Sequence, residues 1–164
     1  MSYDISQSVA LYRDTVFRVA LGYVRNRHDA DDVAQNVFVK LLTSQKVFTS
    51  DEAERAWLIR VAINECKNLH KSAWKKNRAE LDESLVAPQN GDLLLYDYVK
   101  ALKPKYRTVI YLYYYENYKA GEISKILKIS PSTVATHLHR ARKQLKQLIE
   151  KEEESYEPKI FGII

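Results

Sequence analysis

The sequence predicts an all-α protein made of two small helical domains. Gly and Pro number only four each in 164 residues, too few for the many tight turns of an all-β protein. Apolar residues recur at spacings of three and four along most of the chain, as in amphipathic helices. A stretch of acidic and small residues with Pro88 and Gly91 interrupts this pattern and predicts a flexible linker. The predicted organisation is a domain at 1–77, a linker at 78–91, a domain at 92–150 and an acidic and apolar tail at 151–164.

Two helices are predicted before residue 45. The first spans 8–25, and its inward face is formed by Val9, Tyr12, Val16, Val19, Ala20 and Tyr23. The second spans 30–44, because Asp29 is a good N-cap and Asp32 favours the exposed amides of the first turn. Its apolar side is formed by Val33, Ala34, Val37, Phe38 and Leu41.

A third, longer helix is predicted after a polar connection at 45–50. Ser50 or Asp51 caps it, and it continues to about Asn77. Its buried stripes are formed by Ala56, Trp57, Ile59, Val61, Ala62, Ile63, Cys66 and Leu69. Its second half is basic, with Lys67, His70, Lys71, Lys75, Lys76 and Arg78. We therefore expect one end of this helix to pack in the domain core and the other end to form a binding surface.

The second domain is predicted to begin with a helix at 92–102, whose apolar side carries Leu93, Leu94, Tyr96, Val99 and Leu102. Pro104 suits the first turn of the next helix, which runs to about Glu116. The tyrosines of that helix have two interpretations. They form a base-stacking platform, or they form the core and rim of the domain, which we favour because tyrosine buries well with its hydroxyl outward.

The last pattern predicts a helix-turn-helix. A short helix at 120–127 has Ile123, Ile126 and Leu127 inward, and Lys128-Ile129-Ser130 forms a tight turn with a buried Ile. Ser130 caps the next helix and Pro131 takes its first position. That helix runs to about Glu150 with Val134, Leu138, Ala141, Leu145 and Leu148 inward. A short helix, a tight turn and a longer basic helix are typical of this motif.

Composition limits the classes of function. The net charge of +5 permits nucleic-acid binding without proving it, and each basic run, 67–78 and 140–146, has a plain alternative as a solvated helix face. The single cysteine, Cys66, cannot form an intrachain disulfide or the centre of a metal cluster, and it suits a reducing cytoplasm. The first residues lack the pattern of a signal peptide, and no apolar stretch is long enough to span a bilayer. We therefore expect a cytoplasmic protein.

The second helix of the motif predicts DNA binding. The outer face of its first turns carries Ser132, Thr133, Ala135, Thr136 and His137, and cations follow at Arg140, Arg142, Lys143 and Lys146. Short polar groups can approach bases and phosphates, while cations neutralise the backbone. A helical hairpin with a basic, solvated face is the alternative. A repressor carries the same pattern, so the motif alone does not identify the function.

Three motifs resemble a known family. The segments 106–116, 122–130 and 132–142 resemble region four of extracytoplasmic-function (ECF) sigma factors of bacteria. Residues 29–38 resemble the region-two helix by which that family grips RNA polymerase, and residues 55–64 resemble its promoter-melting helix. The resemblance covers roughly Val9 to Leu148. It implies a region-two three-helix bundle and a region-four helix-turn-helix that recruit polymerase core to promoters.

The resemblance also implies roles for individual residues. Polymerase core would be bound by Asp29, Asp32, Gln35 and Asn36. The minus-ten element would be bound by Arg60, Asn64, Lys67, Lys71 and Lys75, with the loop 43–50 near a pocket for an extruded base. The minus-thirty-five element would be bound by Ser132, Thr133, Thr136, His137, Arg140 and Lys143.

Several positions depart from the family pattern. Lys128 stands where Gly is usual, at a position that often needs a left-handed backbone and costs roughly 1 kcal/mol without Gly. Lys103 stands where Pro is common, and Asn36 where an acid is usual. Ala135 and His137 replace basic residues, which weakens phosphate attraction and leaves the preferred minus-thirty-five sequence open.

The resemblance implies promoter DNA and polymerase core as partners, no cofactor and no catalysis by this chain. It also implies an anti-sigma partner that covers both domains and can hold the protein at the membrane. Two alternatives stay open. A stand-alone helix-turn-helix regulator leaves the motifs at 29–38 and 55–64 unexplained. A metal-dependent nucleic-acid enzyme using Asp29, Asp31 and Asp32 lacks a second group of ligands.

Overall fold

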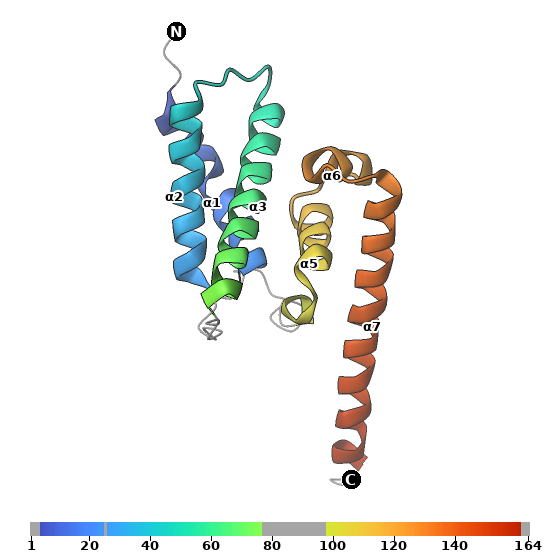
Figure 1. The fold of residues 1–164 in the computed structure, drawn as a ribbon. Coiled ribbons are helices and arrows are strands. Elements are labelled where there is room, and N and C mark those ends of the chain that lie inside the picture. Colours follow the sequence, from blue (N-terminus) through green and yellow to red (C-terminus); the bar gives the residue numbers. More distant parts are fainter. Residues whose placement is uncertain (1–3, 25, 77–97, 162–164) are drawn as a thin grey trace. The chain divides into compact units, whose positions relative to one another are not determined.

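The computed structural model describes residues 4–24, 26–76 and 98–161 (Figure 1). Every regular element in these ranges is a helix, so the predicted all-α class is confirmed. The elements are α1 (Ile5–Val24), α2 (Arg27–Ser44), α3 (Asp51–Lys76), α5 (Pro104–Ile110), a π-helix η1 (Tyr111–Tyr115), α6 (Ala120–Leu127) and α7 (Pro131–Phe161). Two compact units result, one from α1 to α3 and one from α5, η1, α7 and the first part of α6. The predicted linker, 78–91, lies outside the described residues, so its boundaries stay a prediction.

The first unit is a three-helix bundle in which each of α1, α2 and α3 contacts the other two. Its centre is made of side chains that are less than 2% exposed on all three helices: Val16, Val37, Leu41, Leu58, Ile59 and Cys66. Burial of each large apolar side chain contributes about 1.5–3 kcal/mol before entropy is counted. Leu58, which the sequence analysis left out of the buried stripe, is fully buried.

The start of α2 corrects the sequence prediction. Asn26, not Asp29, is the N-cap, and the helix begins at Arg27. The Asn26 side chain accepts a hydrogen bond from the Asp29 backbone N–H at 2.8 Å and donates one to the Asp29 carboxylate. The first bond caps the helix, and the second joins the two side chains, so both residues are held at the helix start. Asp29 therefore lies in the first turn, where its charge still complements the helix dipole.

Two other helix starts follow from their caps. Helix α1 begins three residues before the predicted start, because Asp4 Oδ1 accepts a hydrogen bond from the Ser6 N–H at 3.0 Å. Helix α3 begins where expected, with Ser50 Oγ accepting from the Ala53 N–H at 3.1 Å. Caps of this kind satisfy amides that have no partner inside the helix.

The second unit packs α5 against α7, with Val99, Val109, Leu112, Ile123 and Val134 fully buried. Of the predicted helix at 92–102, only the end is described, and residues 98–101 are helical. Pro104 opens α5 as predicted. The expected α-helix to Glu116 is wrong after Ile110, since the chain widens there into the π-helix η1.

The helix-turn-helix has the predicted bounds for α6 and the predicted cap for α7. Ser130 Oγ accepts a hydrogen bond from the Thr133 N–H at 3.1 Å, and Pro131 is the first residue of α7. Lys128 has a φ of 54°, so the expected left-handed turn is present, while Ile129 is half-buried and not fully buried. The predicted end of α7 near Glu150 is wrong, because the helix continues to Phe161.

Candidate nucleic-acid interface

The predicted polymerase-binding residues share one exposed side of α2. Asp32, Gln35 and Asn36 are exposed and are spaced by three and one residues, which places them on one face of the helix. His28 Nε2 lies 3.5 Å from Asp32 Oδ2 at the edge of this face. Asp29 is half-buried and is hydrogen-bonded to Asn26, so part of its hydrogen-bonding capacity is used at the start of α2.

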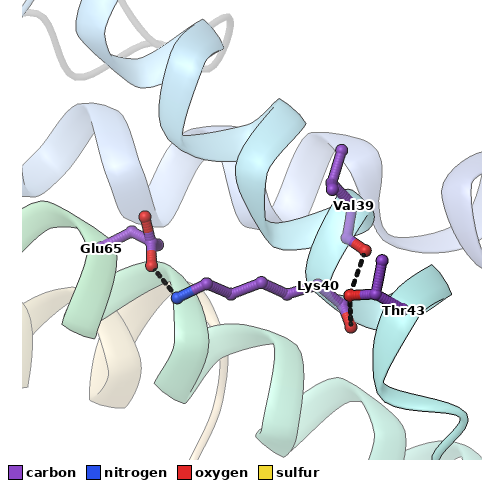
Figure 2. A network of polar contacts seen from close by, with 4 residues as sticks. All are labelled: Val39, Lys40, Thr43 and Glu65. Carbon is purple, nitrogen blue, oxygen red and sulfur yellow. Dashed lines mark hydrogen bonds and ion pairs between the residues drawn. The ribbon is translucent and has the colours of Figure 1, made fainter.

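An ion pair ties this side of α2 to α3. The Lys40 ammonium donates to the Glu65 carboxylate across the two helices (Figure 2). Beside it, Thr43 Oγ1 donates to the backbone carbonyls of Val39 at 3.0 Å and Lys40 at 3.3 Å. Lys40 is about half exposed, so the pair contributes at most about 1 kcal/mol to stability. Its geometric effect is to fix where the exposed faces of α2 and α3 meet.

The predicted minus-ten residues form a single stripe on α3. Arg60, Asn64, Lys67 and Lys71 follow one another at spacings of four, three and four residues, so they share a helix face. Arg60 is half-buried and the other three are exposed. Lys75 continues the spacing, but its side chain lies outside the described residues. A row of cations with a polar amide suits a phosphate backbone that runs along the helix.

The loop between α2 and α3 is held by an aromatic contact that the sequence analysis missed. Phe48 packs against Trp57 with ring centroids 5.7 Å apart, and Lys46 Nζ lies 5.5 Å from the centre of the Trp57 ring. Gln45 has a φ of 51°, which turns the chain out of α2. Val47 is left 92% exposed at the tip of the loop. Phe48, an aromatic residue in a polar connection, was the available signal in the sequence.

The first turns of α7 present a cluster of hydroxyl groups. Ser132 and Thr136 are exposed and Thr133 is half-buried. The Ser130 hydroxyl lies 3.0 Å from that of Ser132 and 2.7 Å from that of Thr133, and Thr136 Oγ1 donates to the Ser132 carbonyl at 2.9 Å. These bonds orient the hydroxyls, which keep further lone pairs for a ligand. Arg140 is exposed one to two turns further along the helix.

Lys143 and His137 differ in their surroundings. Lys143 is exposed, as expected for a phosphate contact. His137 is half-buried, and its ring meets Tyr106 of α5 edge-on, with centroids 5.6 Å apart and an interplanar angle of 86°. Burial lowers the pKa of His137, and the charges of Lys105 and Arg140 lower it further. This shift favours the neutral imidazole, which offers one donor and one acceptor nitrogen.

The exposed tyrosines of η1 engage Arg142. Tyr113, Tyr114 and Tyr115 are between 37% and 52% exposed, so they belong to the rim, whereas Tyr106 is in the core at 6%. Arg142 Nε donates to Tyr114 Oη at 2.8 Å, and its guanidinium lies 5.5 Å from the Tyr113 ring and 5.6 Å from the Tyr114 ring. The sequence analysis grouped Arg142 with the other cations of α7, but the structure gives it a partner on η1.

Other kinds of site were sought in the same described ranges. No group of three or more His, Cys, Asp or Glu side chains in them is arranged to hold a metal ion. Within those ranges, too, no helix is both long and apolar enough to cross a bilayer.

Comparisons with known proteins match both halves of the chain. A family model for sigma-70 region 2 matches residues 9–76, and one for sigma-70 region 4 matches residues 92–145. The RNA polymerase sigma factor SigV of Bacillus subtilis is 28% identical, with 87% of this chain and 89% of the relative covered. The ECF RNA polymerase sigma factor SigW of the same organism is 27% identical, with 85% of each chain covered.

A solved structure has the same fold. It is the sigma factor RpoE in complex with the anti-sigma factor NepR from Bartonella quintana, with a TM-score of 0.76 and 22% sequence identity. The match covers 90% of this chain and 97% of that one. The shared architecture accounts for both helical units in a single chain.

Proposed function

This chain belongs to the ECF family of bacterial RNA polymerase sigma factors, which bind core polymerase and direct it to promoters. From that membership, we propose which surface of the chain binds polymerase core and which surfaces bind the two promoter elements. The exposed side of α2 binds polymerase core through Asp32, Gln35 and Asn36, with Asp29 at its edge. The stripe on α3 binds the minus-ten element through Arg60, Asn64, Lys67, Lys71 and Lys75. The start of α7 reads the minus-thirty-five element through Ser132, Thr133, Thr136, His137, Arg140 and Lys143.

The main observation that supports these surface assignments is the stripe on α3. Exposed Asn64, Lys67 and Lys71 lie on one face of a helix whose opposite face is buried in the bundle. Cations along one line neutralise successive phosphates, while the loop that carries Val47 lies at the other end of α3. Unpairing and unstacking a base costs a few kcal/mol, so a continuous row of cations along the separated strand helps to offset that cost.

The remaining assignments follow from the same premise. The working domains are 1–77 and 92–150, joined by the linker 78–91, with the segment 151–164 after them. The chain performs no catalysis, since polymerase carries out nucleotide addition. It acts in the cytoplasm, and an anti-sigma protein covers both domains and holds the factor inactive, in some conditions at the membrane. Linking two modest DNA-binding modules on one polymerase raises their effective concentration, so neither needs high affinity alone.

The test is reconstitution with polymerase core. Full-length protein and core are mixed with a random DNA pool, and bound sequences are selected and transcribed. We expect enrichment of two short elements at fixed spacing and transcripts that begin downstream of them. Selection of DNA by the chain without core would favour a stand-alone regulator, and a failure to bind core would overturn the proposal.

A matched pair of variants tests the α2 surface. Asp32→Ala removes a charge from the proposed polymerase-binding side of α2, whereas Asp31→Ala removes a charge from an exposed neighbour that lies off that side. We expect Asp32→Ala to weaken core binding about tenfold and Asp31→Ala to change it by less than about twofold, measured by competition for core against the unmodified protein. Equal effects of the two variants would contradict the assignment of this face.

A further inference from the structure

Tyr106 of α5 packs against α7 beside two of the proposed minus-thirty-five residues. Its side chain is 6% exposed, in contrast to the exposed tyrosines of η1. Its ring receives the edge of His137 at a centroid distance of 5.6 Å, and Lys105 Nζ lies 5.1 Å from the ring centre on the same element. The position of His137 is thus fixed by a rigid, buried ring.

The hydroxyl of the same tyrosine engages a second residue of α7. Interaction with the Arg140 side chain is the main reason that the pKa of Tyr106 lies below its ordinary value. Arg140 follows His137 by three residues, so both side chains lie on one face of α7, with Thr133 one turn before them. One tyrosine therefore packs against a histidine and interacts electrostatically with an arginine, and both of these residues are proposed to meet DNA.

We propose that Tyr106 is a positioning residue for promoter reading, which orients His137 and Arg140 before α7 meets the upstream duplex. This inference rests on the proposed function of α7. Side chains that are already oriented lose less conformational entropy on binding, and an ordered side chain selects among base edges more sharply than a mobile one. A neutral histidine next to an oriented guanidinium offers a donor, an acceptor and a fixed cation to the major groove.

Two substitutions separate the ring from the hydroxyl. Tyr106→Phe keeps the ring against His137 and removes the hydroxyl that interacts with Arg140, while Tyr106→Leu removes the ring as well. Tyr114→Phe is the matched control, since it removes a tyrosine–arginine hydrogen bond between η1 and Arg142 in the same unit. Each full-length variant is combined with polymerase core, and bound DNA is selected from a random pool and its affinity measured.

We expect Tyr106→Phe to lower affinity for the selected upstream element by about two- to tenfold and to relax its base preference. The downstream element selected by the holoenzyme and the affinity for core should be unchanged, as should all properties of Tyr114→Phe. Unchanged upstream preference and affinity in Tyr106→Phe would overturn the inference. A wild-type chain that fails to form a promoter complex would instead overturn the proposed function itself.

A spectroscopic readout detects orientation independently of DNA. His137 is surrounded by Tyr106 and Lys105 on α5 and by Arg140 on α7. Its ring protons, followed by NMR across pH, should titrate below the ordinary range in the wild type and closer to it in Tyr106→Leu. They should keep the wild-type ring-current shift in Tyr106→Phe. Identical His137 spectra in the wild type and Tyr106→Leu would show that the ring does not hold the histidine.

Discussion

Glu54 is a carboxylate in the core of the first unit. It is 7% exposed, and Ser8 Oγ donates a hydrogen bond to its Oε1 at 2.5 Å, which joins α1 to α3. Burial raises the pKa of Glu54 above its ordinary value, since the charged form loses hydration. This contact could not be predicted from the sequence, because an acid in the first turn of a helix is usually explained by the helix dipole alone.

Replacing Glu54 with Gln should change how stability depends on pH. A carboxyl whose folded pKa is raised stabilises the fold fully below its unfolded pKa and loses that contribution as pH rises through the folded pKa. The stability of the wild type relative to Glu54→Gln should therefore fall as pH rises from about 4 to 7. Urea unfolding of both proteins at several pH values measures this difference, with Glu52→Gln, exposed in the same turn, as the control. A difference that does not vary with pH would contradict the assignment.

Cys66 shows the opposite case, in which sequence reasoning was sufficient. Its place in an apolar stripe predicted a buried thiol, and the structure gives it no exposed surface. Burial is the largest cause that raises the pKa of Cys66, to about 12. A thiol with so little thiolate at neutral pH is a poor nucleophile, so its role is packing.

At the scale of elements, the turn before α7 carries a measurable strain. Lys128 has a φ of 54°, a left-handed conformation that costs a residue with a Cβ about 1 kcal/mol relative to Gly. Lys128→Gly should therefore raise the free energy of unfolding by up to about 1 kcal/mol, less the extra freedom that Gly gives the unfolded chain. Thermal or urea unfolding measures the change.

Asn117 provides the control for that prediction. It has a φ of 58°, but Asn tolerates the left-handed region better than Lys does. Asn117→Gly should therefore stabilise the protein less than Lys128→Gly. The reverse order would mean that the Lys128 side chain makes contacts whose loss outweighs the relief of backbone strain.

Helix interiors were predicted more reliably than helix ends, of which the start of α2 and the end of α7 were wrong. The apolar spacing placed Val16, Val37 and Ile59 correctly in the core, because burial follows periodicity. The start of α2 was misplaced because Asn26 and Asp29 are both good caps and only geometry decides between them. The end of α7 was misplaced because a change to acidic residues does not by itself stop a helix, and no Gly or Pro occurs between Glu150 and Pro158.

The site was predictable to the level of helix faces but not of contacts. Spacing alone put Asn64, Lys67 and Lys71 on one side of α3. It could not show that His137 rests on Tyr106, or that Arg142 engages Tyr114, because those contacts join elements separated by about 30 residues. The π-helix that presents the exposed tyrosines depends on packing and leaves no periodic signature in the sequence.

At the scale of the whole molecule, both proposed DNA-binding surfaces would act through phosphate neutralisation, and the salt dependence of binding would count their contacts. The logarithm of the binding constant falls with the logarithm of salt concentration, by about 0.9 per neutralised duplex phosphate and about 0.7 per single-strand phosphate. Lys143→Ala, on the surface proposed to meet the duplex, should therefore reduce the slope for holoenzyme on its selected promoter by about 0.9. Lys67→Ala, on the surface proposed to meet the melted strand, should reduce it by about 0.7.

The two surfaces should also behave independently in that measurement. Lys143 and Lys67 lie on different units, so the double variant should show the sum of the two changes in slope. Lys40→Ala is the control, because that cation is paired with Glu65 and is not on either surface. If Lys40→Ala reduced the slope as much as Lys67→Ala, the general positive charge of the chain would explain its attraction to DNA, and the stripe on α3 would have no special role. A reduction confined to Lys67 and Lys143 requires instead that both units contact the same promoter at once, as a factor bound to one polymerase must.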